Sequence, residues 1–319
     1  MEEFVLLTSE QMKGFAERVA EELKVLKATF AYSSVTISTF ADKSNDVHIP
    51  VNVRKKNVYL VHSFSNPNDG YMQLFLLNDA LKRASAEHIV NVLPYIPYSR
   101  KDWKDRPRVP IAAKLFAQLT EASGATRVIT NDLHAAQIQG FYDIAVDNLE
   151  SERLLAEYVK KEYSAQLGSM VVVAPDTGRA KLARNFARRL GLNIAIIDKR
   201  RLRVNEAEVM HIVGDVSGKV CFMLDDMIDT GGTLVEGAKA LLKNGAIEVY
   251  AACTHAILSE KNGIKAEDKI LSSIKEIIIT DSIPRSDTHP RIRVMSLAGL
   301  YANVIFRTET GKSVSELFC

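Results

Sequence analysis

The chain has 319 residues, of which 47% are apolar and 25% charged, and its net charge is +2. This length predicts about two domains, and the near-neutral charge gives no indication of a nucleic-acid partner. No apolar run reaches the ~18 residues of a membrane helix, and three cysteines are too few for a disulfide framework, so we expect a cytoplasmic protein without nucleic-acid or membrane partners.

Short β-branched runs alternate with amphipathic helical stretches along the chain. A strand at 4–7 precedes a helix at 10–23, which opens on a capping-box pattern in which Gln11 can reach back to the cap. Further helices are expected at 74–84, at 111–122 and before Gly191 and Gly245, two glycines of the kind that end helices. The other strands are expected at 35–39, 58–62, 89–93, 127–130, 170–174, 193–197, 220–224, 247–253, 276–280 and 292–296.

This alternation predicts an α/β fold with mostly parallel central sheets flanked by helices. The apolar strand 170–174 is typical of a strand covered on both faces. We expect an N-terminal domain at 1–148, a C-terminal domain at 149–302, and a segment at 303–319 that packs back on the first domain.

The run 220–234 carries the most chemistry. A buried strand is expected to end in two adjacent carboxylates, Asp225 and Asp226, and a glycine-containing stretch then leads into a helix. Backbone N–H groups at a helix N-terminus favour an anion, whereas carboxylates repel phosphate and suit sugar hydroxyls or a divalent cation. The pattern therefore indicates ribose 5-phosphate, and solvated acids beside an ordinary turn are the alternative. The stretch consists of Asp229, Thr230, Gly231, Gly232 and Thr233.

A side chain in place of Gly231 is expected to fill the space of the phosphate and to exclude a positive φ, while the following helix still forms and the protein stays folded. The stretch is not a P-loop, because it lacks the Gly-Lys-Ser/Thr ending.

The run 225–233 resembles the phosphoribosyl-diphosphate loop that phosphoribosyltransferases share with ribose-phosphate diphosphokinases. Six further segments resemble the diphosphokinases: YIPYSRKD at 95–102, RVPIAAK at 108–114, DLHAAQIQGF at 132–141, APDTG at 174–178, DKRR at 198–201 and SVSELF at 313–318. The resemblance covers nearly the whole chain in order. It implies two phosphoribosyltransferase-like domains, a magnesium-ATP site and a homohexamer that transfers the diphosphate of ATP to ribose 5-phosphate.

The resemblance also implies roles for single residues. Lys199 is expected to stabilise the transferring diphosphate, Arg201 to hold ribose 5-phosphate, and Arg100 to lie on a loop that closes over polyphosphate. His134 and Asp176 are expected to bind Mg²⁺. Without the resemblance, the three cations are equally typical of solvated surface charge, and a lone histidine is more often structural.

Two further sets follow from the resemblance alone. One set lines a regulatory site for inorganic phosphate and ADP between subunits: Asp143, Ser313 and Ser315. The other set binds ATP: Phe40, Asp42, Ser44, Arg100, Lys101, Asp102 and His134.

The chain departs from the family pattern mainly where adenine is bound. Ser44 replaces a glutamate, Lys101 replaces a glutamine, Trp103 enters the basic loop, and Arg179 replaces the second glycine after Asp176. These departures predict weaker discrimination among purine donors. They also leave room for a non-catalytic regulatory paralogue, whereas a phosphoribosyltransferase that consumes the product is disfavoured by Arg100, His134 and Lys199.

Overall fold

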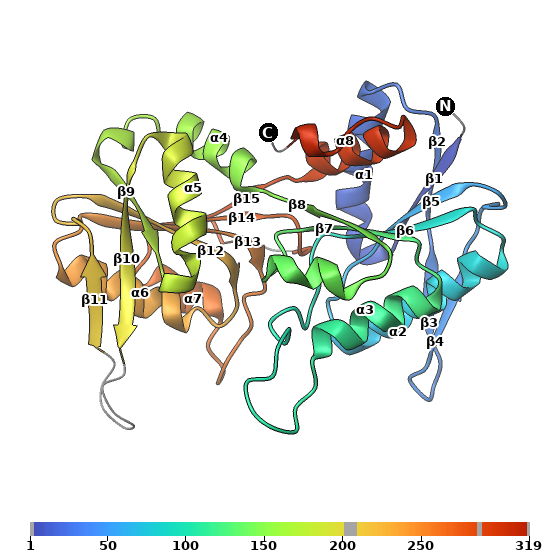
Figure 1. Cartoon of the computed structure of the whole chain (residues 1–319), viewed down its shortest axis with the longest axis horizontal. Coiled ribbons are helices and arrows are strands. Elements are labelled where there is room, and N and C mark those ends of the chain that lie inside the picture. The colour runs from blue at the N-terminus through green and yellow to red at the C-terminus, as the bar shows by residue number, and fades with distance from the viewer. Residues whose placement is uncertain (1–2, 201–208, 286–288, 318–319) are drawn as a thin grey trace. The chain divides into compact units, whose positions relative to one another are not determined.

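The computed structural model describes residues 3–200, 209–285 and 289–317 (Figure 1). Its contacts divide the chain into two compact units. Unit 1 consists of Met1–Glu150, Ser282–Pro284 and Ser296–Cys319. Unit 2 consists of Ser151–Asp281 and Arg285–Met295. The chain thus leaves unit 1 two residues after the expected boundary and returns to it just before its last α-helix.

The centre of unit 1 is a six-stranded sheet in the order β2-β1-β5-β6-β7-β8, in which every neighbouring pair is parallel. Its strands are β1 (Phe4–Thr8), β2 (Phe30–Ser34), β5 (Asn57–Val61), β6 (His88–Leu93), β7 (Arg127–Asn131) and β8 (Ala145–Leu149). A separate antiparallel hairpin is formed by β3 (Thr36–Thr39) and β4 (Asn45–His48). The α-helices of the unit are α1 (Lys13–Val25), α2 (Pro67–Arg83), α3 (Ala112–Ser123) and α8 (Ala298–Glu309).

Helix α8 joins the end of the chain to the first sheet. It packs against α1, where the rings of Phe15 and Tyr301 meet edge to face with centroids 5.5 Å apart. The Glu309 carboxylate accepts hydrogen bonds from Tyr59 Oη at 2.7 Å and Asn57 Nδ2 at 3.0 Å, both on β5. Burial raises the pKa of Tyr59, and its bond to Glu309 acts in the same direction.

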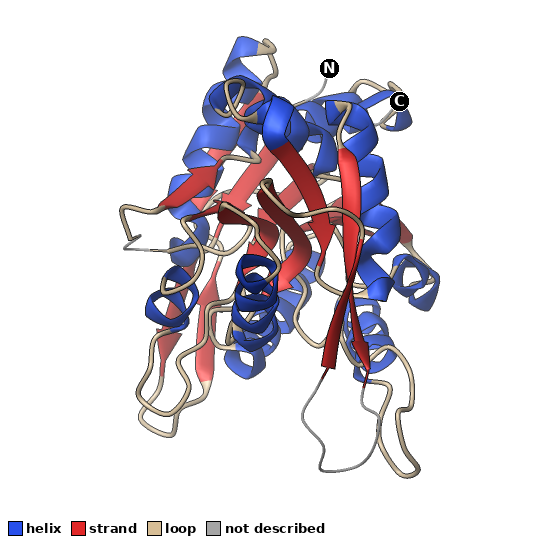
Figure 2. Ribbon diagram, turned by 90° about the vertical axis from the view of Figure 1, so that its left-hand side faces the viewer, coloured by secondary structure: helices blue, strands red, loops and turns tan. Residues whose placement is uncertain are grey.

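The centre of unit 2 is a seven-stranded sheet in the order β11-β10-β9-β12-β13-β14-β15. Figure 2 shows the strands of the chain in red and its helices in blue. All neighbours are parallel except β10 and β11. Its strands are β9 (Met170–Ala174), β10 (Asn193–Arg200), β11 (Val209–Val213), β12 (Val220–Ile228), β13 (Glu248–Ala256), β14 (Glu276–Thr280) and β15 (Ile292–Met295). Its α-helices are α4 (Glu152–Glu162), α5 (Ala180–Leu190), α6 (Gly232–Lys243) and α7 (Ala266–Leu271).

Alternate residues of β12 face two helical layers, because successive side chains of a strand point to opposite faces. Cys221 and Met223 join the core that contains residues of α6 and α7, whereas the ring of Phe222 stacks on Phe186 of α5, with centroids 5.6 Å apart. Both faces of the strand are therefore covered, as its unbroken apolar sequence predicts. No helix among the described residues is long and apolar enough to cross a membrane.

The predicted fold class is confirmed, with differences in detail. The strands β2, β4, β8 and β11 were not predicted; three of them lie at sheet edges and one in the hairpin, so they need less apolar sequence. Ser9 accepts no side-chain capping bond, so the expected capping box is wrong. Helix α2 begins at Pro67, seven residues before the expected start, because the Asn66 side chain caps it by accepting from Asn68 N–H at 3.2 Å.

Candidate active site

Three neighbouring strands of unit 2 bring the predicted residues to one edge of its sheet. The order β10-β9-β12 is parallel throughout, so the carboxyl ends of these strands lie side by side. Lys199 is near the end of β10, Asp176 follows β9 by two residues, and Asp225 lies in the last part of β12. In open α/β sheets, ligands bind at this edge.

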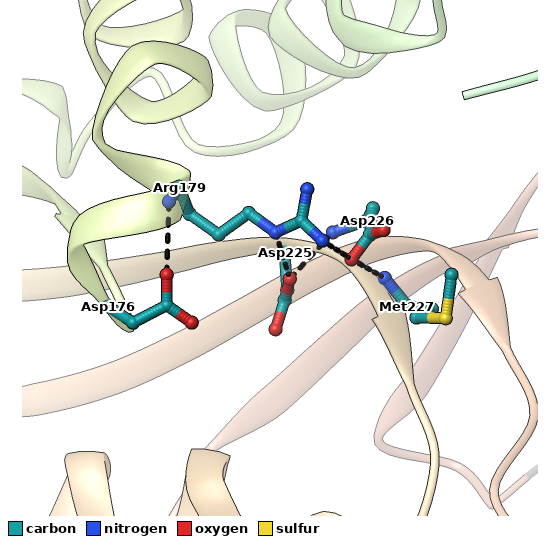
Figure 3. Close-up of polar contacts among 5 residues, drawn as sticks. All are labelled: Asp176, Arg179, Asp225, Asp226 and Met227. Atoms are coloured by element: carbon teal, nitrogen blue, oxygen red, sulfur yellow. Dashed lines mark hydrogen bonds and ion pairs between the residues drawn. The ribbon is translucent and has the colours of Figure 1, made fainter. Parts of the chain in front are cut away.

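The carboxylates Asp225 and Asp226 lie inside β12, not at its end as predicted, because pairing with β13 continues to Ile228. Both are joined to Arg179, which follows β9 by five residues (Figure 3). Arg179 Nε lies 3.1 Å from Asp225 Oδ1, and Arg179 Nη2 lies 2.7 Å from Asp226 Oδ1. The Asp225 side chain is 21% exposed and that of Asp226 is 6% exposed.

Asp225 and Asp226, here called the acid pair, are two largely buried carboxyl groups that face one arginine. Burial raises the pKa of Asp225 above its usual range, the neighbouring Asp226 carboxyl acts in the same direction, and the Arg179 guanidinium opposes the shift. Backbone groups orient the same carboxylates: Asp226 N–H donates to Asp225 Oδ1 at 2.9 Å, and Met227 N–H donates to Asp226 Oδ1 at 2.8 Å. The pair is therefore held in a fixed geometry at the edge of the sheet.

The predicted phosphate loop leads directly into a helix. Asp229 and Thr230 follow β12, Gly231 is the N-terminal cap of the twelve-residue helix α6, and Gly232 and Thr233 form its first turn. Gly231 has a φ of +69°, a left-handed conformation that favours glycine. The N-terminal N–H groups of α6 can therefore bind an anion beside the acid pair.

The expected positive φ of Gly231 is confirmed, and its packing adds a further reason for glycine at this position. A Cβ atom at this position would meet Cγ1 of Ile270 on α7 at 2.3 Å, so it would overlap the protein core. A substitution there would disturb the packing of α6 on α7, so we expect it to lower local stability in addition to any effect on phosphate binding. At Gly232, a Cβ atom would meet only Lys269 Nζ, at an ordinary 3.5 Å.

The structure describes the other two predicted cationic site residues of unit 2, Lys199 and Arg201, only in part or not at all. Lys199 is paired through its backbone with Met210 of β11, while its side chain lies outside the described atoms. Arg201 lies outside the described residues. Their roles therefore stay predictions.

In unit 1, two neighbouring parallel strands lead to the predicted ATP residues. The loop that carries Arg100, Lys101 and Asp102 follows β6, and His134 follows β7 by three residues. Gln137 Nε2 donates to Asp102 Oδ2 at 3.1 Å, which connects the loop after β6, here called the basic loop, to the segment of His134. Lys101 Nζ lies 3.4 Å from Asp105 Oδ2, both exposed.

The other predicted ATP residues lie at the tip of the β3–β4 hairpin. The Asp42 carboxylate accepts hydrogen bonds from the backbone N–H and the hydroxyl of Ser44, at 3.0 and 2.6 Å, and these bonds lower its pKa. Phe40 is 57% exposed. The tip is thus ordered by its own contacts and presents an aromatic ring to its surroundings.

The two predicted metal ligands belong to different units: His134 to unit 1 and Asp176 to unit 2. Asp176 Oδ1 accepts the backbone N–H of Arg179 at 3.0 Å, which fixes the carboxylate. In the parts of the chain that the structure describes, no three His, Cys, Asp or Glu side chains gather to hold a metal ion. The Asp176 carboxylate is a ligand of the type that Mg²⁺ prefers, since this ion takes one or two carboxylates and completes its shell with phosphates and water.

The predicted regulatory residues all lie in unit 1 and are exposed. Asp143 N–H donates to the Glu121 carboxylate, and the backbone oxygen of Ser313 accepts from Arg307 at 2.6 Å. Ser315 begins a short 3-10 helix. These contacts hold the segments in place and leave their regulatory role a prediction.

Arg179 is the site residue whose role the sequence did not indicate. Its sequence signal was only the replacement of a glycine, and its partners are more than forty positions away along the chain. Only the parallel pairing of β9 with β12 brings the arginine to the acids.

Comparisons with known proteins agree with these features. Residues 4–124 match the model of the N-terminal domain of ribose phosphate pyrophosphokinase. Residues 200–319 match that of the phosphoribosyl synthetase-associated domain.

Relatives of known name cover almost the entire chain. The ribose-phosphate pyrophosphokinase of Rhizobium meliloti is 47% identical over 309 residues, which are 96% of this chain and 98% of that protein. The protein of the same name from Campylobacter jejuni is 43% identical over 306 residues, 95% of each chain. The crystal structure of phosphoribosylpyrophosphate synthetase from Mycobacterium smegmatis superposes with a TM-score of 0.87 at 36% identity, covering 97% of this chain and 99% of that one.

Proposed function

Because the chain belongs to the ribose-phosphate pyrophosphokinase family, we propose that it transfers the diphosphate of ATP to the C1 hydroxyl of ribose 5-phosphate. The products are 5-phosphoribosyl 1-diphosphate and AMP. The observation that carries the proposal is the carboxyl edge of β10-β9-β12, where an anion-binding helix start lies beside a carboxylate pair.

Ribose 5-phosphate would bind at this edge with its two ends on different groups. The N–H groups at the start of α6 and the hydroxyls of Thr230 and Thr233 suit its phosphate. The Asp225 carboxyl group suits the ribose hydroxyls, because its oxygens accept hydrogen bonds from hydroxyl donors, which phosphate oxygens do not supply. Arg201 would add a positive charge to the same ligand.

The transfer step is an in-line attack of the C1 hydroxyl oxygen on the β-phosphorus of ATP. The bond from ribose O1 to the β-phosphorus forms, the bond from that phosphorus to the α–β bridging oxygen breaks, and AMP leaves with the electron pair. The C1 hydroxyl releases its proton to water. Such a reaction depends on positioning and charge neutralisation. Lys199 and Arg100 would supply positive charge to the transferring diphosphate, and the basic loop after β6 is the segment of unit 1 able to hold polyphosphate.

Magnesium fits His134 and Asp176 as two of its ligands and would supply charge neutralisation at the ATP phosphates. Phe40, Asp42 and Ser44 would contact the adenine from a neighbouring subunit, which requires an assembly of several copies. A homohexamer that responds to inorganic phosphate and ADP at Asp143, Ser313 and Ser315 belongs to the same proposal. A cytoplasmic location agrees with Cys221 and Cys253, which are buried free thiols among the residues that the structure describes.

Incubation of the purified chain with magnesium, ribose 5-phosphate and ATP tests the proposal. We expect AMP and 5-phosphoribosyl 1-diphosphate in equal amounts. No turnover in a chain that binds ATP would instead support the regulatory paralogue, whereas AMP without a phosphoribosyl product would show hydrolysis of ATP and contradict both readings. Asp225→Asn should raise the KM for ribose 5-phosphate while leaving that for ATP nearly unchanged.

A further inference from the structure

Arg179 meets the two carboxylates with one edge of its guanidinium. Nε contacts Asp225 and Nη2 contacts Asp226, at 3.1 and 2.7 Å, and these two nitrogens form the fork that arginine uses for paired acceptors. The Arg179 side chain is 19% exposed, so most of this contact is removed from water. A partly buried fork of this kind is held more firmly than an exposed ion pair.

Arg179 and the two carboxylates that it contacts are held in place by separate hydrogen bonds (Figure 3). The backbone of Arg179 is fixed at the start of α5, where Asp176 accepts its N–H. The acids are fixed by the backbone N–H groups of Asp226 and Met227. The guanidinium therefore fills a defined place between two fixed elements, β12 and the turn after β9.

Two adjacent carboxylates in a mostly buried place need a compensating cation to stay ionised, because burial and their weakly screened repulsion otherwise favour protonation of one of them. Without the Arg179 side chain, a divalent ion would suit the place between the two acids, since carboxylate oxygens are its preferred ligands. Arginine keeps its charge at every physiological pH, so its compensation is permanent. The family pattern has glycine at this position, which can supply no such charge.

We propose that Arg179 is a positioning residue that takes the place of a divalent cation at Asp225 and Asp226, so that this acid pair accepts ribose hydroxyls without a metal ion of its own. This inference rests on the proposed binding of ribose 5-phosphate at the carboxyl edge of unit 2. Asp225 is the member of the pair that reaches the sugar, because its side chain is 21% exposed whereas that of Asp226 is 6% exposed.

Manganese binding to the nucleotide-free full chain tests the inference without reference to catalysis. Free Mn²⁺ is followed by electron paramagnetic resonance. Arg179→Ala should gain one site at least about tenfold tighter than any that the unmodified chain forms at the acid pair, and adding Asp225→Asn should abolish it. In the unmodified chain, Asp225→Asn should change nothing. Arg184→Ala, which removes an exposed arginine of α5, is the matched control and should behave like the unmodified chain.

Ribose 5-phosphate binding measured by calorimetry without ATP gives the second readout. The unmodified chain should bind equally well in EDTA and in magnesium. Arg179→Ala should bind about tenfold more weakly in EDTA and recover in magnesium, the loss expected for a hydrogen-bonded charge. Arg179→Lys, which keeps the charge without the fork, should fall between the two.

Three results would overturn the inference: a metal requirement for ribose 5-phosphate binding by the unmodified chain, a manganese site at its acid pair, or no gain of manganese in Arg179→Ala. A chain that binds no ribose 5-phosphate under any condition would contradict the proposed function instead. In that case the manganese titration alone would still decide whether Arg179 occupies a cation position.

Discussion

A methyl group at Gly231 should loosen the phosphate loop from inside the protein. In Gly231→Ala, the new Cβ would lie 2.3 Å from Cγ1 and 2.6 Å from Cδ1 of Ile270, and the residue would keep a φ of +69°. Overpacking of this kind costs about 1–3 kcal/mol, and a left-handed non-glycine residue about 1–2 kcal/mol. We therefore expect a loss of roughly 2–5 kcal/mol in local stability.

Hydrogen exchange of the backbone amides in α6 and α7 measures this loss where it arises. A loss of 2–5 kcal/mol corresponds to a fall in protection of about 30-fold to several thousand-fold, at ~1.36 kcal/mol per factor of ten. Gly232→Ala is the matched control, because its Cβ meets Lys269 Nζ at only 3.5 Å and its position is helical. Its protection should be unchanged or slightly higher.

Removing the obstacle should restore part of the stability. Ile270→Ala alone costs about 2–5 kcal/mol through the cavity that it leaves. Added to Gly231→Ala, it should cost about 1–3 kcal/mol less than it does alone, because the overlap has gone. Strictly additive effects, or equal protection in Gly231→Ala and Gly232→Ala, would refute the reasoning.

Three other outcomes are expected. Burial lowers the pKa of His62 to about 4, and its Nε2 lies 2.9 Å from the Gly70 oxygen. Between pH 6.5 and 4 only the unfolded chain therefore binds a proton at His62, so the free energy of unfolding should fall by about 2 kcal/mol from pH 7 to 5. Urea unfolding measures this fall, which should be smaller in His62→Gln. Lys199→Ala should lower kcat by about 10²- to 10³-fold with little change in the KM for ribose 5-phosphate, and near-normal turnover would remove Lys199 from the mechanism. Lys101 has no hydrogen-bond acceptor and Ser44 replaces the usual acceptor glutamate, so the ratio of kcat/KM for ATP over GTP should stay below ~10⁴, and a higher ratio would show that other groups make the selection.

Much of the fold could be predicted because its buried strands are continuous apolar runs between helix signals. The run 220–224 shows this well, since both faces of β12 are covered by helices. Edge strands such as β2, with the sequence FAYSS, bury less and carry a weaker pattern. They form because a neighbouring strand offers unpaired backbone groups, and the local sequence does not record that neighbour.

The candidate site likewise has a part that the sequence predicts and a part that it does not. The acids and glycines of the phosphate loop are close in sequence, so their spacing already indicates the ligand. The contacts that fix them are distant in sequence: Arg179 with the acid pair, and Gly231 with Ile270. Both depend on how helices and strands of unit 2 pack, which is why the first was seen only as a departure and the second as a phosphate contact.

The most direct test of the proposed function follows the β-phosphorus of ATP. The purified chain is given ribose 5-phosphate, magnesium and ATP that carries a ³²P label at the β position, and the products are separated. The label should appear in 5-phosphoribosyl 1-diphosphate, with unlabelled AMP formed in equal amount. Label that remains in ADP would show transfer of the γ-phosphoryl group alone, and label that remains in ATP would show no transfer; either result contradicts the function proposed for this chain.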